Sequence, residues 1–189
     1  YILFLGRVCK GKNIHHLIEF FVEFKKKYSN SNLKLILAGL KERDLRIPNS
    51  NDIVFLGYVP EERKSDLIAN SLALVNPSEL ESLALISMEA VALERPILVN
   101  DKCPINRYYK KHIDSVFLYN EFESFSAQLN KIQSADWSSS HSILLQGKDW
   151  VNQNFNWETV IAQYSKAVHQ GKMCTGKIGD EKVTQYDFS

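Results

Sequence analysis

The sequence predicts an α/β protein: a doubly wound, Rossmann-like parallel sheet of six strands with helices on both faces. Six short runs are rich in Leu, Ile and Val without polar alternation, which is typical of strands covered on both faces. Longer amphipathic segments separate these runs, and strands that alternate with helices pair in parallel through right-handed crossovers. The length of 189 residues suits one such domain.

The predicted strands start with the first residues of the chain. They cover residues 2–5, 33–38, 53–56, 72–76, 97–100 and 115–118. Because the first strand begins abruptly, we expect the chain to be a piece of a longer protein.

Amphipathic segments fill the gaps between the strands. The first carries apolar residues at helical spacing from Ile14 to Phe24, and its end, Lys25 to Lys27, is expected to be solvated. Pro60 opens the second, in a position that proline favours. The predicted helices cover residues 13–28, 61–69, 83–93, 121–132 and 157–169. The Ser-rich residues 134–142 are predicted to be a loop, and residues 171–189 a polar, poorly ordered tail after a single domain of residues 1–170.

The composition excludes several classes of protein. A net charge of +1 offers no large field to hold nucleic acid. No apolar run approaches the roughly 20 residues of a membrane span. The three cysteines lack C-x-x-C spacing, so we expect a reduced, cytoplasmic protein without a structural metal.

Two unusual polar segments are predicted to meet at one edge of the sheet. With strand order 3-2-1-4-5-6, ligands bind outside the carboxyl ends of strands 1 and 4, where the order reverses. Residues 6–13 follow strand 1, and residues 77–85 follow strand 4 and lead into a helix. The sequence therefore predicts a binding crevice between these segments.

Each segment carries candidate ligand groups. Arg7 suits a diphosphate by its fork geometry and Lys12 as a point charge, although both could simply be solvated loop charges.

In the second segment, a helix starting near Leu83 would present free N–H groups to an anion. Glu81 precedes this helix and Glu89 lies about two turns inside it, where carboxylates could accept hydrogen bonds from sugar hydroxyls. The alternative is that Glu81 is an acid near the helix N-cap and Glu89 a surface residue; Glu89 has apolar neighbours, so we expect it to be partly buried and in need of a partner.

These residues resemble the C-terminal domain of GT-B glycosyltransferases of the retaining family 4. That family reads roughly G-R-x-x-x-x-K-N/G after the first strand of the domain and P-S-x-x-E-x-F-G-x-x-x-x-E-A after the fourth. Here the patterns become Gly6-Arg7 with Lys12-Asn13, and Pro77-Ser78 with Glu81 and Glu89-Ala90. Weaker matches are 37–39, 54–59, 95–99 and 155–157, so the resemblance covers about residues 1–169.

The resemblance implies a function and a set of site residues. The chain would be the nucleotide-sugar-binding domain of a hexosyltransferase, mannosyltransferase-like, that uses a UDP- or GDP-linked sugar. Arg7, Lys12 and Glu81 would be catalytic, the cations stabilising the leaving diphosphate in place of a metal. Other donor contacts would come from Gly6, Tyr58, Val59, Ser82, Leu83, Ala84, Leu85 and Glu89. No cofactor is expected.

The resemblance also implies what this chain lacks. A glycan or lipid-linked acceptor would bind through an N-terminal domain absent from this chain, so we expect this chain to bind donor weakly and transfer nothing. The full enzyme would be cytoplasmic, and its association with the cytoplasmic face of a membrane is left open.

Three departures from the family pattern stand out. Ala84 replaces a common glycine, which keeps the backbone N–H unless the position needs a positive φ. Glu94 replaces a glycine at the helix end, so we expect the left-handed cap to be lost and a negative charge to be badly placed. The loop that begins at Asp101 lacks a glutamate often found there.

Other functions stay open at this stage. Gly6-x₄-Gly11-Lys12 matches a P-loop, but Asn13 replaces the Ser or Thr that would bind Mg²⁺. A catalytically silent sugar-nucleotide-binding module and a GT-B epimerase are further alternatives. A dinucleotide dehydrogenase is disfavoured because no G-x-G-x-x-G follows strand 1.

Overall fold

A computed structural model describes the backbone of residues 1–173 and the side chains of residues 1–168. The chain forms two compact units, Tyr1–Asn152 and Gln153–Ser189. The first unit contains the sheet. In the second, helix α7 (Trp157–Met173) includes the first three residues of the predicted tail; the rest of that tail lies outside the described residues.

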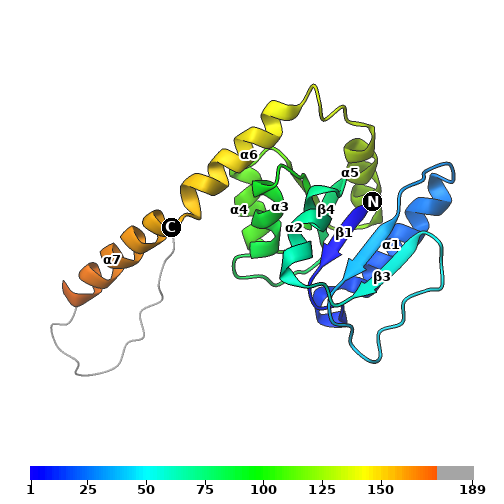
Figure 1. The fold of residues 1–189 in the computed structure, drawn as a ribbon, viewed down its shortest axis with the longest axis horizontal. Helices are drawn as coiled ribbons and strands as arrows, with labels where there is room; N and C mark the ends of the chain where they lie inside the picture. Colours follow the sequence, from blue (N-terminus) through cyan, green and yellow to red (C-terminus); the bar gives the residue numbers. More distant parts are fainter. Residues whose placement is uncertain (174–189) are drawn as a thin grey trace. The chain divides into compact units, whose positions relative to one another are not determined.

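The first unit is built on a six-stranded parallel sheet, which confirms the predicted fold class (Figure 1). The strand order is β3-β2-β1-β4-β5-β6, as expected. The strands are β1 (Ile2–Leu5), β2 (Leu35–Ala38), β3 (Ile53–Gly57), β4 (Ala73–Asn76), β5 (Ile97–Asn100) and β6 (Val116–Tyr119). Strands β4 and β5 are buried along their whole length because both faces are covered by helices.

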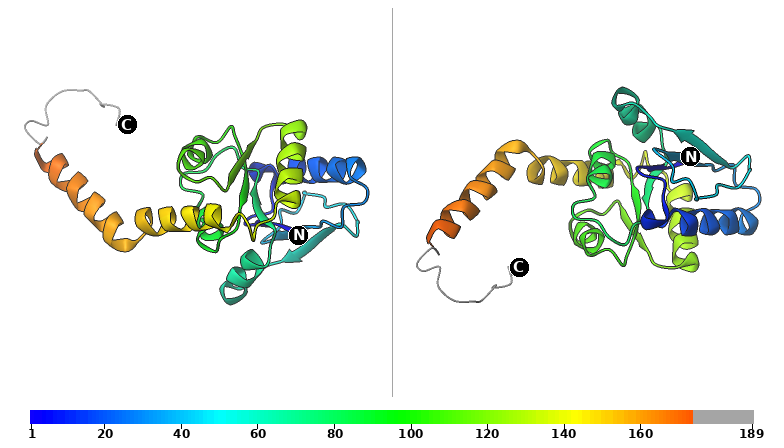
Figure 2. Two further views of the ribbon diagram at one scale, coloured as in Figure 1. Left: turned by 90° about the horizontal axis from the view of Figure 1, so that it is seen from above. Right: turned by 90° about the horizontal axis from the view of Figure 1, so that it is seen from below.

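Helices lie on both faces of this sheet. Helices α1 and α5 share one face, whereas α2, α3 and α4 lie on the other (Figures 1 and 2). The bounds are η1 (Lys10–Lys12), α1 (Ile14–Lys27), α2 (Glu61–Ala69), α3 (Leu85–Ala92), α4 (Pro104–His112), α5 (Phe122–Ser134) and α6 (His141–Asn154). The apolar positions predicted for α1 are all buried and pack in one core with α5.

Two of the α-helices that the structure describes, α4 and α6, were given no bounds in the sequence analysis. Helix α4 is nine residues long, and a proline stands in its first turn. Helix α6 begins inside the predicted Ser-rich loop and carries Gly147, a poor helix former. A Cβ at Gly147 would lie 3.0 Å from side-chain atoms of Ile113 and Val91, so this glycine lets α6 pack closely. The tertiary contact, rather than helix propensity, explains the residue.

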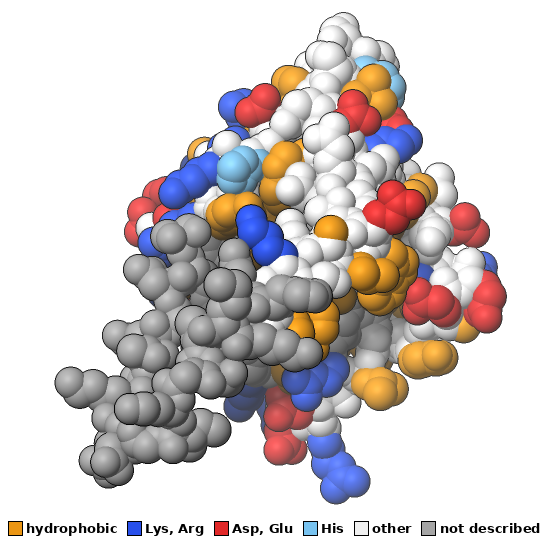
Figure 3. All heavy atoms as spheres, turned by 90° about the vertical axis from the view of Figure 1, so that its left-hand side faces the viewer, with side chains coloured by type: hydrophobic (Ala, Val, Ile, Leu, Met, Phe, Trp, Pro, Cys, Tyr) orange, Lys and Arg blue, Asp and Glu red, His pale blue; other side chains and the backbone are white. Residues whose placement is uncertain are grey.

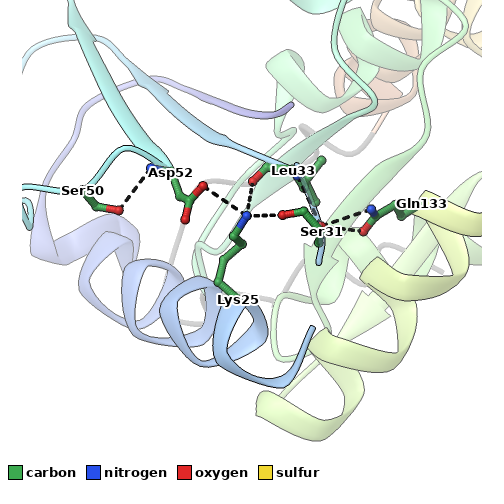
Figure 4. Close-up of polar contacts among 6 residues, drawn as sticks. All are labelled: Lys25, Ser31, Leu33, Ser50, Asp52 and Gln133. Carbon is green, nitrogen blue, oxygen red and sulfur yellow. Dashed lines mark hydrogen bonds and ion pairs between the residues drawn. The ribbon is translucent and has the colours of Figure 1, made fainter. Parts of the chain in front are cut away.

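Lys25 corrects the expectation of a solvated helix end. Its ammonium pairs with Asp52 Oδ1 at 3.1 Å and donates to the carbonyls of Leu33, at 3.2 Å, and Ser31 (Figure 4). The Ser31 hydroxyl in turn contacts Gln133 of α5. Because these groups precede β2 and β3, Lys25 fastens the amino ends of the strands, the edge opposite the predicted crevice. Lys26 and Lys27 are exposed, as expected.

The end of α3 corrects a second expectation. Glu94 itself adopts the left-handed conformation, with φ of 58°, and the helix is capped by hydrogen bonds from Glu94 N to Val91 O and from Arg95 N to Ala90 O, both 2.9 Å. The Glu94 carboxylate lies 2.6 Å from Lys148 Nζ and 3.7 Å from His141 Nε2, both on α6. The cap is therefore retained without glycine, and the charge is compensated by α6.

We expect Glu94→Gly and Glu94→Ala to have opposite effects on stability. Glycine removes a left-handed strain of roughly 1–2 kcal/mol, whereas the lost surface ion pair contributes at most about 1 kcal/mol. Alanine loses the pair and keeps the strain. Urea denaturation at pH 7 should therefore find Glu94→Gly at least as stable as the parent and Glu94→Ala less stable. Equal stability of the two variants would contradict the strain argument.

The difference in stability between Glu94→Gly and the parent should depend on pH. The hydrogen bond from Lys148 lowers the pKa of Glu94 below its ordinary value. Its stabilisation is therefore present above the pKa of the unfolded carboxyl group and lost as pH falls through the lowered folded pKa. The advantage of Glu94→Gly over the parent should grow in acid.

Candidate functional site

The segment after β1 is held against the segment after β2. Gly6 N donates to Ala38 O and Val8 N to Leu40 O, both at 2.9 Å, so the pairing of these strands continues past their ends. Arg7 lies between these bonds with its side chain exposed. The chain then forms η1 and enters α1 through Asn13, whose φ is 56°.

The segment after β4 is fixed at its start by two amides. Asn13 Nδ2 and Asn100 Nδ2 lie 3.3 Å and 3.1 Å from Pro77 O. The Ser78 hydroxyl donates to Leu80 O at 3.0 Å. Pro77 and Ser78 are buried, so the segment begins from a rigid base.

An ion pair also joins the two segments. Lys12 Nζ lies 2.5 Å from Glu81 Oε1, and the two side chains are only 26% and 16% exposed. This contact joins residues 69 positions apart, because β1 and β4 are neighbours at the point where the strand order reverses. Arg7 lines an open hollow together with Lys12 and Leu80. The structure thus brings Arg7, Lys12 and Glu81 to one edge of the sheet.

Glu89 lies in a different environment from Glu81. Its carboxylate is 2.8 Å from Lys64 Nζ of α2, and its side chain is 43% exposed. Partial burial lowers the pKa of Lys64, but the hydrogen bonds to Glu89 and Glu61 outweigh it and raise that pKa overall. The expected partner of Glu89 is therefore a lysine of the neighbouring helix.

Helix α3 begins later than predicted. Ala84 is its N-cap, with φ of 45° and ψ of 49°, and Leu85 is the first helical residue. Because a left-handed residue cannot continue a helix, residues 83 and 84 stay outside it. Glu89 is consequently about one turn, not two, from the helix start. Position 84 therefore requires a positive φ, which glycine adopts more readily than alanine.

The remaining predicted site residues lie along the same edge. Ser82, Leu83 and Leu85 are exposed around the start of α3, and Ala84 is buried. Tyr58 and Val59 follow β3, at the end of the strand order; Tyr58 is 71% exposed and Val59 is half-buried.

Several contacts that shape the site were missed from the sequence. Asn13 and Asn100 hold Pro77, Lys64 holds Glu89, and Tyr109 of α4 donates its hydroxyl to Leu83 O at 2.5 Å. A polar residue ending a buried strand could have singled out Asn100. Lys64 and Tyr109 carry no such signal, since each depends on how neighbouring elements pack.

The site offers cations, a carboxylate and helix N–H groups. Arg7 and Lys12 can take a diphosphate, the N–H groups at the start of α3 can take a further anionic oxygen, and Glu81 can accept from hydroxyl groups. Among the described residues, no group of three or more His, Cys, Asp or Glu is placed to hold a metal ion.

Comparison with known proteins gives this arrangement a family. The family model described as glycosyl transferases group 1 matches residues 1–144. The chain belongs to this family.

Two curated relatives show how much of a full protein this chain represents. It is 24% identical over 170 residues to an uncharacterised glycosyltransferase of Methanocaldococcus jannaschii, covering 86% of this chain and 43% of that protein. It is 28% identical over 163 residues to glycosyltransferase 1 domain-containing protein 1 of Xenopus tropicalis, covering 84% and 46%. The chain thus spans less than half the length of these curated relatives.

A solved structure shares the fold of this chain. Anabaena HepE, in complex with UDP and glucose, superposes with a TM-score of 0.72 at 16% identity, over 89% of this chain and 48% of HepE. At this identity the likeness shows the fold, which is the one shared by GT-B glycosyltransferases.

Proposed function

We propose that this chain is the nucleotide-sugar-binding half of a retaining, family 4 glycosyltransferase that transfers a hexose to a glycan or lipid-linked acceptor. The observation that carries the proposal is the ion pair between Lys12 and Glu81, with Arg7 lining the same hollow. Cations and a carboxylate from distant segments converge beside the N-terminus of α3. Membership of the group 1 family favours this reaction over P-loop nucleotide binding and over a dehydrogenase.

Each residue has a role in the proposed reaction. As the sugar–phosphate bond breaks, negative charge grows on the departing diphosphate, and Arg7 and Lys12 stabilise it more in the transition state than in the ground state. Lys12 exchanges part of its contact with Glu81 for the phosphate. Glu81 then orients the hydroxyls of the transferred sugar, and Glu89 those of the ribose.

The rest of the donor lies along the same edge. The N–H groups at the start of α3, near Ser82 to Leu85, hold a phosphate, and Tyr58 and Val59 border the base. HepE, whose structure contains UDP and glucose, supports a nucleotide-linked sugar as donor. We propose a UDP- or GDP-linked hexose such as mannose, with no metal or other cofactor.

The acceptor belongs to the other half of the protein. The chain covers less than half of the length of these relatives, so we propose an N-terminal domain that binds the acceptor.

No helix in the described part of the chain is long and apolar enough to cross a membrane. On the face shown in Figure 3, acidic and basic side chains are interspersed among the described residues. We propose a cytoplasmic enzyme, with any membrane contact made by the full-length protein.

Ligand-induced stabilisation tests this proposal on the chain itself. UDP-glucose, GDP-mannose and ADP-glucose are each titrated in a thermal-shift series, with the corresponding free nucleosides as controls. Binding stabilises the fold by about 2.7 kcal/mol at a ligand concentration 100 times Kd. We expect one nucleotide sugar to raise Tm and its nucleoside to do so far less, without sugar transfer by the isolated chain.

Two outcomes would contradict the proposal. If MgATP is added to the series and is the only ligand that raises Tm, the P-loop alternative would be favoured. Binding of a nucleotide sugar by the chain, together with a full-length protein that neither transfers nor hydrolyses it, would favour a silent binding module.

A further inference from the structure

Helix α4 holds the far end of the loop between β4 and α3 directly, and the near end through Asn100 of β5. At the far end, the Tyr109 hydroxyl donates to Leu83 O at 2.5 Å, from a side chain that is 1% exposed. At the near end, Asn106 Nδ2 donates to Asn100 O at 2.8 Å, and Asn100 Nδ2 donates to Pro77 O. Hydrogen bonds from α4 and from Asn100 therefore fix the position of both ends of this loop.

The bond from Tyr109 falls next to the most strained residue of the loop. Ala84, with φ of 45° and ψ of 49°, adopts the left-handed conformation that glycine takes without penalty and alanine avoids. Its carbonyl accepts from Ser87 N at 2.8 Å, which starts the hydrogen bonding of α3. If Ala84 relaxed to an extended or helical conformation, the first N–H groups of α3 would point elsewhere.

We infer that Tyr109 is a positioning residue that holds Ala84 in its left-handed conformation and so aims the start of α3 at the donor diphosphate. The inference rests on the proposed function only for the identity of the ligand. In this chain, a tyrosine hydroxyl takes over what a glycine at position 84 would achieve by its own flexibility.

The hydroxyl is suited to this task over a wide pH range. Burial, and to a lesser extent the neighbouring Tyr108 and Cys103, raises the pKa of Tyr109 to about 12. The group therefore stays protonated and donates to Leu83 O at every pH at which the protein would be assayed.

The chain offers a matched control. Tyr119 of β6 is also buried, and its hydroxyl has no hydrogen-bond partner among the described residues. Tyr119→Phe therefore removes a buried hydroxyl without removing an anchor, whereas Tyr109→Phe removes the anchor. Ala84→Gly serves as the rescue, because glycine holds the left-handed conformation without help.

The first measurement needs no ligand. The backbone coupling and ¹³C shifts of Ala84 report its φ by NMR. We expect Tyr109→Phe to shift them away from left-handed values and Tyr119→Phe to leave them unchanged. Unchanged values in Tyr109→Phe would overturn the inference, whether or not the chain binds nucleotides.

The second measurement compares phosphate-dependent binding. Calorimetry with UDP and GDP, and with uridine and guanosine, gives the ratio of affinities that the diphosphate contributes. We expect Tyr109→Phe to lower this ratio about threefold to tenfold, Tyr109→Phe with Ala84→Gly to restore most of it, and Tyr119→Phe to leave it unchanged.

The outcomes separate this inference from the proposed function. A parallel loss for nucleotide and nucleoside, or a failure of Ala84→Gly to rescue, would mean that Tyr109 is merely structural. Absence of nucleotide binding by the parent chain would contradict the proposed function, and the NMR result would then decide the inference alone.

Discussion

Gly39→Ala is expected to destabilise the protein by more than about 4 kcal/mol, which is among the largest effects of single substitutions and a large share of a typical total. A Cβ at this position would lie 1.8 Å from the Gly6 carbonyl oxygen, a backbone atom that cannot turn away. The φ of +131° at Gly39 adds a strain that any L side chain would feel. Because Gly6 precedes Arg7, the clash falls on the segment that positions the predicted cation. Urea denaturation followed by circular dichroism measures the loss.

Two other glycines separate the clash from the strain. Gly57 has φ of +71° and nothing within 4 Å of the position of a Cβ, so Gly57→Ala should cost only roughly 1–2 kcal/mol of strain. Gly11 has no such φ, and only Cys9 Sγ lies as near as 4.0 Å, so Gly11→Ala should be close to neutral. A Gly39→Ala variant as stable as Gly57→Ala would show that β1 and β2 separate more easily than the structure indicates.

Lys12→Met should weaken binding of the nucleotide-sugar donor about 10- to 100-fold, the range expected for one hydrogen bond to a charged group. Lys12 joins the two binding segments by an ion pair, and its removal leaves the Glu81 carboxylate, 16% exposed, without its cation. Glu81 would then repel the diphosphate. Calorimetric titration with the sugar nucleotide found by thermal shift measures the change.

Lys102→Met is the matched control for Lys12→Met. Lys102 pairs with Glu79 at 3.1 Å, close to Glu81 in sequence, but both partners are well exposed. The Lys102→Met substitution removes one positive charge near the same loop. Donor affinity should fall by less than about twofold, because exposed ion pairs are screened by solvent and salt. If both variants weaken binding equally, the effect of Lys12 is a general one of net charge, and Lys12 does not contact the donor.

The fold could be predicted from short-range patterns. The apolar runs at β1, β4 and β5 are legible because a strand buried on both faces needs continuous apolar side chains. The alternation of strands and helices then limits the strand order to few possibilities. Arg7, Lys12 and Glu81 were placed at one edge by that order alone, since the carboxyl ends of neighbouring parallel strands must lie together.

The conformation of the binding loop could not be predicted in this way. Alanine at position 84 and glutamate at position 94 argue against left-handed backbone, yet both adopt it. Tyr109 of α4 holds the backbone next to Ala84, and Lys148 of α6 pairs with the charge of Glu94; the sequence pattern provided bounds for neither helix. The local conformational preference of a residue is a weak constraint, so contacts with distant residues decide the backbone conformation at both positions.

From its residues alone, then, the chain specifies a parallel sheet and the edge of that sheet at which cations and carboxylates gather, because these follow from periodicity and strand order. The partner of each charged group, and the strained turn that begins α3, emerge only when distant helices pack together. Those features depend on contacts between residues far apart in sequence, which leave no periodic trace along the chain.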